Sequence, residues 1–386
     1  MNTSFEQPSI WQRLKPVFGG FDLWLAVAIA FLAALGLVTM YSAGYDSGTR
    51  FVDHGRNMLL ALAVLFLVAQ VPPQRLMQLA VPLYALGVLL LVVTALPGVG
   101  ITKKGATRWL NIGVVIQPSE ILKIAVPLML AWWFQKREGV ARVSDFLIAA
   151  VLVLLPTLLV VKQPDLGTAL LILSSGLYVM FFAGLAWRLI LPVFLIGAIA
   201  VVALIVSEDR ICAPDVKWPL LRDYQQSRVC TLLDPTKDPL GKGFHIIQGK
   251  IAIGSGGIDG KGFMKGTQTH LEFIPERTTD FIFAAFAEEF GLIGAAALVL
   301  GNIFLIFRGL WIAAEAPTVF TRLLAGAITL GFFTYAFVNM GMVSGILPVV
   351  GVPLPFISYG GTAMVSLGLG LGILMSVARS RRLMQS

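Results

Sequence analysis

Long runs of apolar residues recur along almost the entire chain and are separated by short polar or basic segments. Most runs are close to the ~20 residues that a membrane-spanning α-helix needs, so the pattern predicts about ten transmembrane helices. The run after Asn57 is short for a span, and the run after Ser119 is compatible with a partial or tilted helix, which leaves the number open by about one or two. The runs cover residues 22–43, 57–72, 76–97, 119–135, 143–162, 165–184, 187–206, 280–307, 320–346 and 356–378.

The composition narrows the class of protein further. Hydrophobic residues make up 57% of the 386 residues, charged residues only 13%, and the mean hydropathy is +0.84. These values exclude an ordinary soluble domain and indicate an all-α polytopic membrane protein. We expect a single transmembrane domain over residues 1–386 with one large polar loop over 207–279. Residues 1–21 lack the apolar core of a cleavable signal peptide, so the first span is expected to remain uncleaved.

The basic residues of the short loops predict the orientation of the chain. They are about twice as numerous on one side of the membrane as on the other, and the richer side is expected to be cytoplasmic. Both termini then lie in the cytoplasm and the 207–279 loop lies outside, because long loops are exempt from the rule. The net charge of +8 does not indicate nucleic acid; basic residues on the outer face favour an anionic lipid head group instead. The sparser side carries Arg50, Arg56, Lys103, Lys104, Arg108 and Lys162.

The 207–279 loop contains signs of ordered structure. The only two cysteines, Cys212 and Cys230, both lie in it; they suit a disulfide in an oxidising compartment, and two unlinked thiols are the alternative. Phe244, Ile247 and Ile251 share one helical face, as in an interfacial helix on the outer leaflet, although the β-branched content also fits a strand. The glycine-rich stretch that follows matches no nucleotide-binding motif and is read as a turn.

Ionisable residues next to apolar runs are costly in a membrane and are therefore candidates for function. The predicted topology puts Glu120, Asp165 and Asp280 at the outer ends of helices that run inward, where they could converge on one site. Capping of helix N-termini explains such acidic residues equally well, and Glu120 with Lys123 suits a local ion pair. The functional interpretation is stronger for Asp280, because Glu276 and Arg277 crowd it at the junction of loop and span.

The segment 344–356 is apolar but contains three prolines and cannot form a regular helix. Irregular backbone at membrane depth must be covered by protein or line a cavity. The following residues, Ser358 to Gly361, bring a hydroxyl and small residues to the same outer face. A simple connecting loop is the alternative, and the lack of any charge in this segment argues against it.

Several of these segments together carry a resemblance to a known family. The chain resembles the SEDS family (shape, elongation, division and sporulation) over nearly its whole length. The segments that carry the resemblance are 104–109 (KGATRW), 117–120 (QPSE), 163–168 (QPDLGT), 238–241 (DPLG), 275–282 (PERTTDFI) and 351–355 (GVPLP). The loop from Cys212 to Trp218 departs from the family pattern by being longer.

The resemblance implies a polymerase in the bacterial inner membrane that makes peptidoglycan glycan strands from lipid II during cell elongation. It implies a class B penicillin-binding protein and other elongation-complex membrane proteins as partners. It also implies that Asp280 is the essential acidic residue, with Glu120, Lys123 and Asp165 in or near a central cavity.

The chemistry of such a reaction assigns roles to these residues. A base must take the proton from the 4-hydroxyl of the acceptor sugar, and we expect Asp280 to be that base. Cations must stabilise the leaving pyrophosphate, and we expect Arg277, Arg108 and Lys123 first, with Lys104 also available. No metal-ligand cluster is evident, although a divalent cation such as Mg²⁺ or Mn²⁺ between carboxylate and pyrophosphate is compatible with the chemistry. One direct displacement inverts the configuration at C1.

Two other classes of function remain open. A flippase for the lipid-linked precursor needs polar residues inside a bundle, but would place them near the midplane and show inverted repeats. A non-catalytic scaffold for a penicillin-binding protein explains the helices but gives Asp280 no role. The Asp280→Asn substitution distinguishes these classes.

Overall fold

The computed structural model describes residues 20–96, 98–103, 106–111, 113, 115–137, 142–213, 216, 218, 223–237, 241–274 and 276–385. Within this part of the chain, each of the ten apolar runs corresponds to a helix, which confirms the predicted all-α polytopic class. These helices are α2 (Leu23–Ala43), α3 (Arg50–Ala69), α4 (Pro73–Thr94), α5 (Pro118–Gln135), α6 (Val143–Lys162), α7 (Leu166–Phe182), α8 (Trp187–Val206), α13 (Ile282–Ala314), α14 (Val319–Val343) and α15 (Gly361–Gln385).

Eight of these helices are long and apolar enough to cross a membrane. The other two are the shorter helix α7 and the helix α5, which contains Glu120 and Lys123. The apolar run after Asn57 looked short for a span only because the helix begins earlier, at Arg50, in a more polar sequence. The last run was predicted from residue 356, but residues 355–360 form turns and irregular backbone, so helix α15 starts only at Gly361.

The long loop folds into a layer of short helices. They are α9 (Glu208–Ile211), α10 (Asp223–Leu233), the 3-10 helix η1 (Pro235–Lys237), α11 (Lys242–Gly256) and α12 (Thr267–His270). The Cys212–Cys230 disulfide is present and joins α9 to α10. Helix α11 replaces the strand alternative: it packs on α13, Ile246 and Ala252 are buried, and Ile251 is 45% exposed. We call the end of the bundle that carries this layer the loop end.

A small antiparallel sheet was not predicted from the sequence. Its strands are β1 (Ile101–Lys103), β2 (Ala106–Asn111) and β3 (Val115–Ile116), in the order β1-β2-β3. Ala106 and Leu110 are buried on one face of β2, and the residues between them are half-buried. The sheet connects α4 to α5 and rests on both helices.

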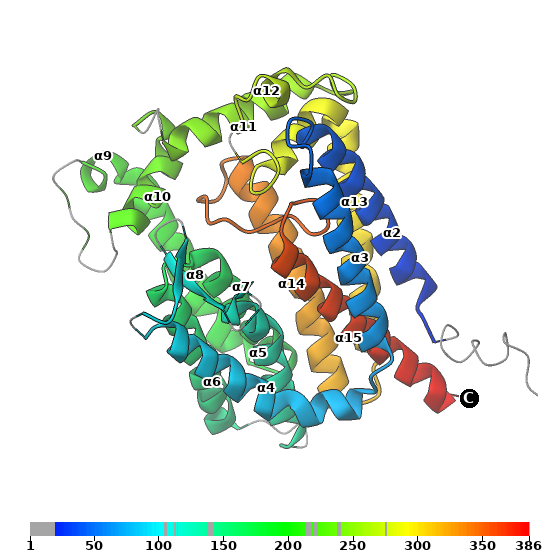
Figure 1. The fold of residues 1–386 in the computed structure, drawn as a ribbon. Helices are drawn as coiled ribbons and strands as arrows, with labels where there is room; N and C mark the ends of the chain where they lie inside the picture. Colours follow the sequence, from blue (N-terminus) through cyan, green and yellow to red (C-terminus); the bar gives the residue numbers. More distant parts are fainter. Residues whose placement is uncertain are drawn as a thin grey trace, which may run out of the picture.

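The helices form two groups that meet along α5, α14 and α15 (Figure 1). In this view α4 to α8 gather on one side, α2, α3 and α13 to α15 on the other, and α10 to α12 lie across the loop end. Helix α5 packs against α4 and α7 in its own group and against α14 and α15 in the other, so it joins the two.

Helices α3 and α15 pack with their backbones unusually close. A Cβ atom at Gly368 would lie 2.3 Å from the carbonyl oxygen of Ala61, and one at Gly372 would lie 2.8 Å from that of Leu65. The two glycines are four residues apart and so lie on the same face of α15. This small-residue spacing allows two membrane helices to approach and gain van der Waals contact.

Helix α13 covers nearly all of the predicted run 280–307 but is kinked within it. Gly291 interrupts α13 with φ 62° and ψ −160°, a conformation open essentially only to glycine. The preceding turns of α13 pack along α11, and the amides of Lys261 and Gly262 donate to the carbonyls of Glu288 and Glu289. A Cβ atom at Gly291 would lie 2.3 Å from the nitrogen of Gly260, so the loop layer itself enforces the kink.

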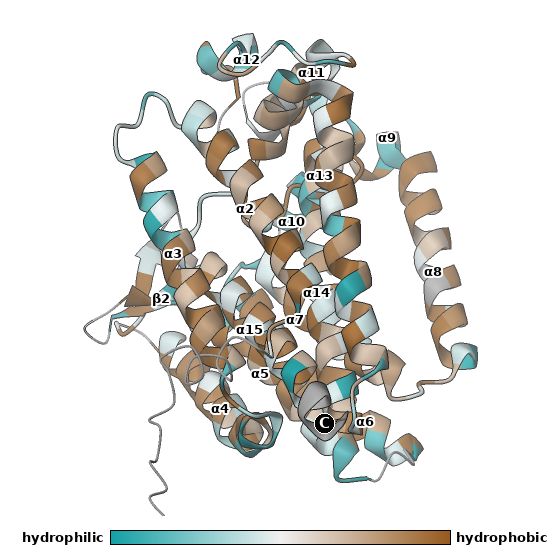
Figure 2. Ribbon diagram, turned by 90° about the vertical axis from the view of Figure 1, so that its right-hand side faces the viewer, coloured by the Kyte–Doolittle hydropathy of each residue, from teal (hydrophilic) through white to brown (hydrophobic). Residues whose placement is uncertain are grey.

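Helix α8 stands apart from the other spans (Figure 2). It is apolar around its whole circumference, and none of its membrane-length window is buried inside the protein. A helix that is hydrophobic all round and has no buried residues in its membrane-length window suits a lipid environment.

Candidate active site

A cavity of about 290 Å³ opens at the loop end of the bundle and collects most of the predicted site residues. The residues that line it fall into two groups, one held by ion pairs and one carried by loop segments. The paired side consists of Arg108, Gln117, Glu120, Lys123 and Asp165, from β2, α5 and the start of α7. The loop side consists of Glu276, Thr279, Asp280, Gly351, Pro353 and Tyr359, from the two segments that precede α13 and α15.

Asp165 is held by its two carboxylate oxygens in different ways. Its Oδ1 accepts from the amide of Thr168, 3.1 Å away, and so caps the N-terminus of α7. Its Oδ2 lies 3.1 Å from the guanidinium of Arg108 and accepts from the side-chain amide of Gln117 at 2.9 Å. The capping and cavity interpretations of Asp165 therefore both hold.

The Glu120–Lys123 pair is present and lines the cavity. Nζ of Lys123 lies 2.7 Å from Oε2 of Glu120, one turn apart on α5, and also donates to the hydroxyl of Tyr335 on α14 at 2.6 Å. Ser366 of α15 donates to the same oxygen of Glu120 at 2.6 Å. The two charged side chains are only 7% and 13% exposed, so this network joins three helices beneath the cavity.

Asp280 lies on the loop side, in a turn formed by residues 276–280. Three consecutive carbonyls of this turn accept hydrogen bonds from outside it. The amide of Tyr359 donates to Thr278, the hydroxyl of Ser358 to Thr279 and the side-chain amide of Asn339 to Asp280, at 2.8, 2.7 and 3.1 Å. Both expectations for the irregular segment 344–356 hold, because Gly351 and Pro353 line the cavity while Val352 and Leu354 are buried in protein.

Arg277 is directed away from the cavity, in contrast to the role expected for it. Its guanidinium lies 2.6 Å from Oδ2 of Asp46 and donates to the carbonyl of Ala43 at 3.1 Å, and it covers the ring of Tyr45. Burial raises the pKa of Asp46, but the hydrogen bond and charge of Arg277 outweigh this and hold that pKa below its usual range. Arg277 thus ties the long loop to the α2–α3 connection.

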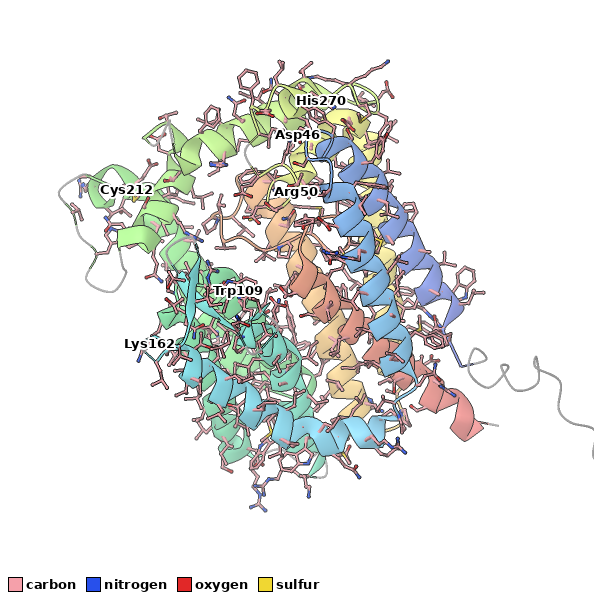
Figure 3. The ribbon with its side chains drawn as sticks, in the orientation of Figure 1. Asp46, Arg50, Trp109, Lys162, Cys212 and His270 are labelled. Atoms are coloured by element: carbon pink, nitrogen blue, oxygen red, sulfur yellow. A yellow bond between two sulfur atoms is a disulfide. The ribbon has the colours of Figure 1, made fainter. Side chains whose placement is uncertain are left out.

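Figure 3 shows Asp46 and His270 close together at the loop end, above Arg50 at the start of α3. Arg50 donates to the hydroxyl of Thr278 at 2.7 Å and lies over the ring of Tyr359. It therefore braces both segments of the loop side, although the sequence marked it only as a topology signal. Trp109, which lines the cavity, lies on the hairpin at the other group of helices.

Lys104, the last of the cations expected at the pyrophosphate, lies outside the described residues. Glu288 and Glu289 are buried in the loop layer rather than in the cavity: Glu288 accepts from Lys261 and from the amides of Gln268 and Thr269, and Glu289 accepts from Ser42. These two glutamates hold α12 and α2 to α13.

An apolar groove of about 770 Å³ runs from the cavity along the bundle. It shares Gln117, Glu120 and Thr362 with the cavity lining, so the two spaces adjoin. The rest of the groove is formed mainly by aliphatic side chains of α3, α4, α5 and α15, namely Leu60, Leu83, Ile121, Ile124, Val365 and Leu369.

Comparison with known proteins gives relatives over almost the full length. Residues 22–383 match the family model FTSW_RODA_SPOVE, described as cell cycle protein. Peptidoglycan glycosyltransferase MrdB of Escherichia coli is 48% identical, over 93% of this chain and 94% of the relative. Stage V sporulation protein E of Bacillus subtilis is 32% identical, over 94% of this chain and 98% of the relative.

Solved structures share the fold. A chain from a peptidoglycan synthase complex has a TM-score of 0.76 and 35% identity, covering 94% of this chain and 98% of that chain. Thermus thermophilus rod shape determining protein RodA has a TM-score of 0.68 and 29% identity, covering 94% of this chain and 97% of that chain. The match over residues 22–383 and these full-length relatives show that the chain belongs to the FtsW/RodA/SpoVE family, the SEDS family that its motifs resemble.

Proposed function

We propose that this chain is a peptidoglycan glycosyltransferase that polymerises lipid II into glycan strands. The observation that carries the proposal is the cavity, where Asp280 shares one open space with two cation–carboxylate pairs. Family membership supports it, because relatives over the full length are named peptidoglycan glycosyltransferases. The similarity to RodA, a rod shape determining protein, supports a role in cell elongation.

Asp280 acts as the general base in this proposal. Its carboxylate takes the proton from the 4-hydroxyl of the acceptor sugar while the hydroxyl oxygen attacks C1 of the donor sugar. The bond between C1 and the pyrophosphate oxygen breaks, and the electron pair leaves with the lipid pyrophosphate. The proton remains on Asp280 until water removes it, and C1 is inverted by the single displacement.

Arg108 and Lys123 stabilise the leaving pyrophosphate in this proposal. Both line the cavity, and fixed cations in a water-poor site stabilise developing negative charge better than mobile ones in water. Nε of Arg108 is buried and donates no hydrogen bond to the described residues, which leaves a donor for an anionic group. Asp165 and Glu120 hold the two cations in place. Arg277 is omitted from the pyrophosphate site because it binds Asp46.

A divalent cation is not part of the proposed step. Among the described residues, no three His, Cys, Asp or Glu side chains gather closely enough to hold a metal ion by themselves. Such an ion would need oxygens of the pyrophosphate among its ligands.

The groove beside the cavity is the proposed path of the lipid. Its aliphatic lining suits an isoprenoid chain, and its junction with the cavity at Glu120 would bring the attached pyrophosphate next to Lys123. We further propose that both termini are cytoplasmic and that the cavity faces outward, as the basic residues of the short loops indicate. A class B penicillin-binding protein is the proposed partner, supported by the similarity to a chain of a peptidoglycan synthase complex.

The test is glycan-strand formation from purified lipid II by the wild-type protein and by Asp280→Asn, each with its penicillin-binding partner. Loss of a general base is expected to lower the rate by about 10²–10⁴-fold. Folding and partner binding are checked first, and Asp259→Asn serves as a control because Asp259 is an exposed carboxylate of the loop layer.

The outcomes separate the classes of function. A flippase would leave supplied lipid II unpolymerised in every sample. A scaffold would bind its partner and support the same polymer yield with and without Asp280. Polymer that disappears only in Asp280→Asn supports the glycosyltransferase.

A further inference from the structure

The side chain of Asn339 lies inside α14, one turn before the end of the helix, and is completely buried. An amide at such a depth is expensive unless it is hydrogen-bonded. Its Nδ2 donates to the carbonyl of Asp280 at 3.1 Å and to the carbonyl of Val352 at 2.7 Å. One NH₂ group therefore connects the two chain segments that form the loop side of the cavity.

The two segments also meet at the carboxylate itself. A Cβ atom at Gly351 would lie 3.4 Å from Oδ2 of Asp280, so the carboxylate rests beside the residue that precedes Val352. Gly351 has φ +77°, which fixes the direction of the backbone there. Asn339 thus donates to the carbonyl of Asp280 itself and to the carbonyl of Val352, which follows Gly351, the residue beside the Asp280 carboxylate.

The rest of the Asn339 side chain shows that packing alone does not explain the residue. Its Oδ1 is buried and accepts no hydrogen bond from the described residues. A leucine of similar size would avoid burying that oxygen, but would leave the Asp280 and Val352 carbonyls without their donor. The residue fits a requirement for two donated hydrogen bonds.

We propose that Asn339 is a positioning residue that sets the place of the Asp280 carboxylate relative to the acceptor hydroxyl. The inference rests on the proposed glycosyltransferase function. Asn339 does not line the cavity, so it acts through Asp280 and not on substrate. Because a shift of about 1 Å at a reacting group can cost about 10²-fold in rate, loss of these bonds should lower kcat and leave KM nearly unchanged.

The first comparison is Asn339→Leu against wild type and against Asn302→Leu. Asn302 is a matched control: it is 5% exposed in the neighbouring span α13, and its amide donates only to Leu298 of its own helix. We expect Asn339→Leu to lower kcat about 10–100-fold with KM for lipid II within about threefold, and Asn302→Leu to stay within about threefold of wild type. Thermal unfolding in detergent identifies any variant that is merely misfolded.

The second comparison uses pH, which a packing defect would not follow. In the Asn339→Asp variant an ionised carboxylate would face two carbonyl oxygens, whereas the protonated acid could donate to one of them. The activity of Asn339→Asp relative to wild type should therefore rise as pH falls, while the relative activity of Asn339→Leu stays constant.

Three results decide the matter. A kcat of Asn339→Leu within threefold of wild type, or an Asn339→Asp variant that is no more active than Asn339→Leu at low pH, overturns the positioning role. Equal losses of kcat in Asn339→Leu and Asn302→Leu would mean that both substitutions act by general destabilisation. That result would also overturn the positioning role. Failure of the wild-type protein to polymerise lipid II would instead refute the proposed function, so the two failures are distinguishable.

Discussion

The two sides of the cavity hold their charged residues by different physical means. On the paired side, each carboxylate is held by a cation through its side chain, Asp165 by Arg108 and Glu120 by Lys123. On the loop side, the Asp280 turn is held through peptide carbonyls by Asn339, Ser358 and Tyr359. A residue anchored by its backbone can change the partner of its carboxylate during a reaction and keep its place.

This difference indicates which side supplies charge and which supplies proton transfer. Two ion pairs are neutral overall, yet they keep two cations fixed in a cavity that a pyrophosphate could enter. The bonds to the peptide carbonyls of the Asp280 turn fix the place of the turn whichever partner its carboxylate has during the reaction.

The largest expected effect comes from breaking the pair that is most buried. Lys123→Met leaves Glu120 without its cation at 13% exposure, and removal of one partner of a buried pair costs about 3–5 kcal/mol. The double variant Lys123→Met with Glu120→Gln should recover most of this stability, since replacing both charges of a buried pair is often neutral. Polymerisation should remain at least tenfold slower in both variants.

Unfolding in detergent and the polymerisation rate are measured for both variants. Lys162→Met serves as the control, because Lys162 is an exposed lysine at the loop end of α6. Recovery of activity in the double variant would mean that the pair is only structural and that the paired side supplies no cation.

A smaller effect is expected for the Arg108–Asp165 pair, which is partly exposed. Arg108 is 28% exposed, so Arg108→Gln should lower stability by about 1 kcal/mol or less. The rate of polymerisation should fall about 10–100-fold, because a fixed cation near the leaving group is lost. The matched control is Arg137→Gln, since Arg137 pairs with Asp145 at 3.3 Å near the start of α6 and away from the cavity.

The two Arg variants should therefore lose similar stability but differ in polymerisation rate. If Arg137→Gln slows polymerisation as much as Arg108→Gln does, the paired side owes its importance to stability alone.

The sequence predicted the spans well because their signal is local. A run of about 20 apolar residues has few alternatives in a membrane, and each run became a helix. The convergence of Glu120, Asp165 and Asp280 was predicted from their expected positions at the starts of apolar helices, and Lys123 follows one turn after Glu120.

The features that the sequence did not reveal depend on contacts far along the chain. The kink at Gly291 lies in an apolar run and is imposed by the loop near Gly260. Arg277 lies three residues from Asp280, but the turn between them directs it to Asp46 instead of the cavity. Asn339 did leave a signal, as an amide within an apolar run, but only the folded chain identifies the carbonyls that it binds.

The smallest expected effect comes from the Arg277–Asp46 pair, which lies outside both sides of the cavity. The pKa of Asp46 is lower in the folded protein than its usual value of 3.8, so the unfolded chain takes up a proton first as the pH falls. The stabilisation is therefore complete well above pH 3.8 and is lost below it. For an exposed pair it should amount to about 1 kcal/mol or less.

Thermal unfolding of wild type and Asp46→Asn between pH 7 and pH 3 checks this, at the acid extreme that the protein tolerates in detergent. The difference should be constant near neutral pH and should begin to shrink as the pH falls to about 3.8, where the unfolded chain takes up the Asp46 proton before the folded protein does. Polymerisation should change less than in Arg108→Gln, because Arg277 does not line the cavity. A loss of polymerisation as large as that of Arg108→Gln would mean that the Arg277–Asp46 pair belongs to the active site. The site would then comprise this pair in addition to the paired side and the loop side.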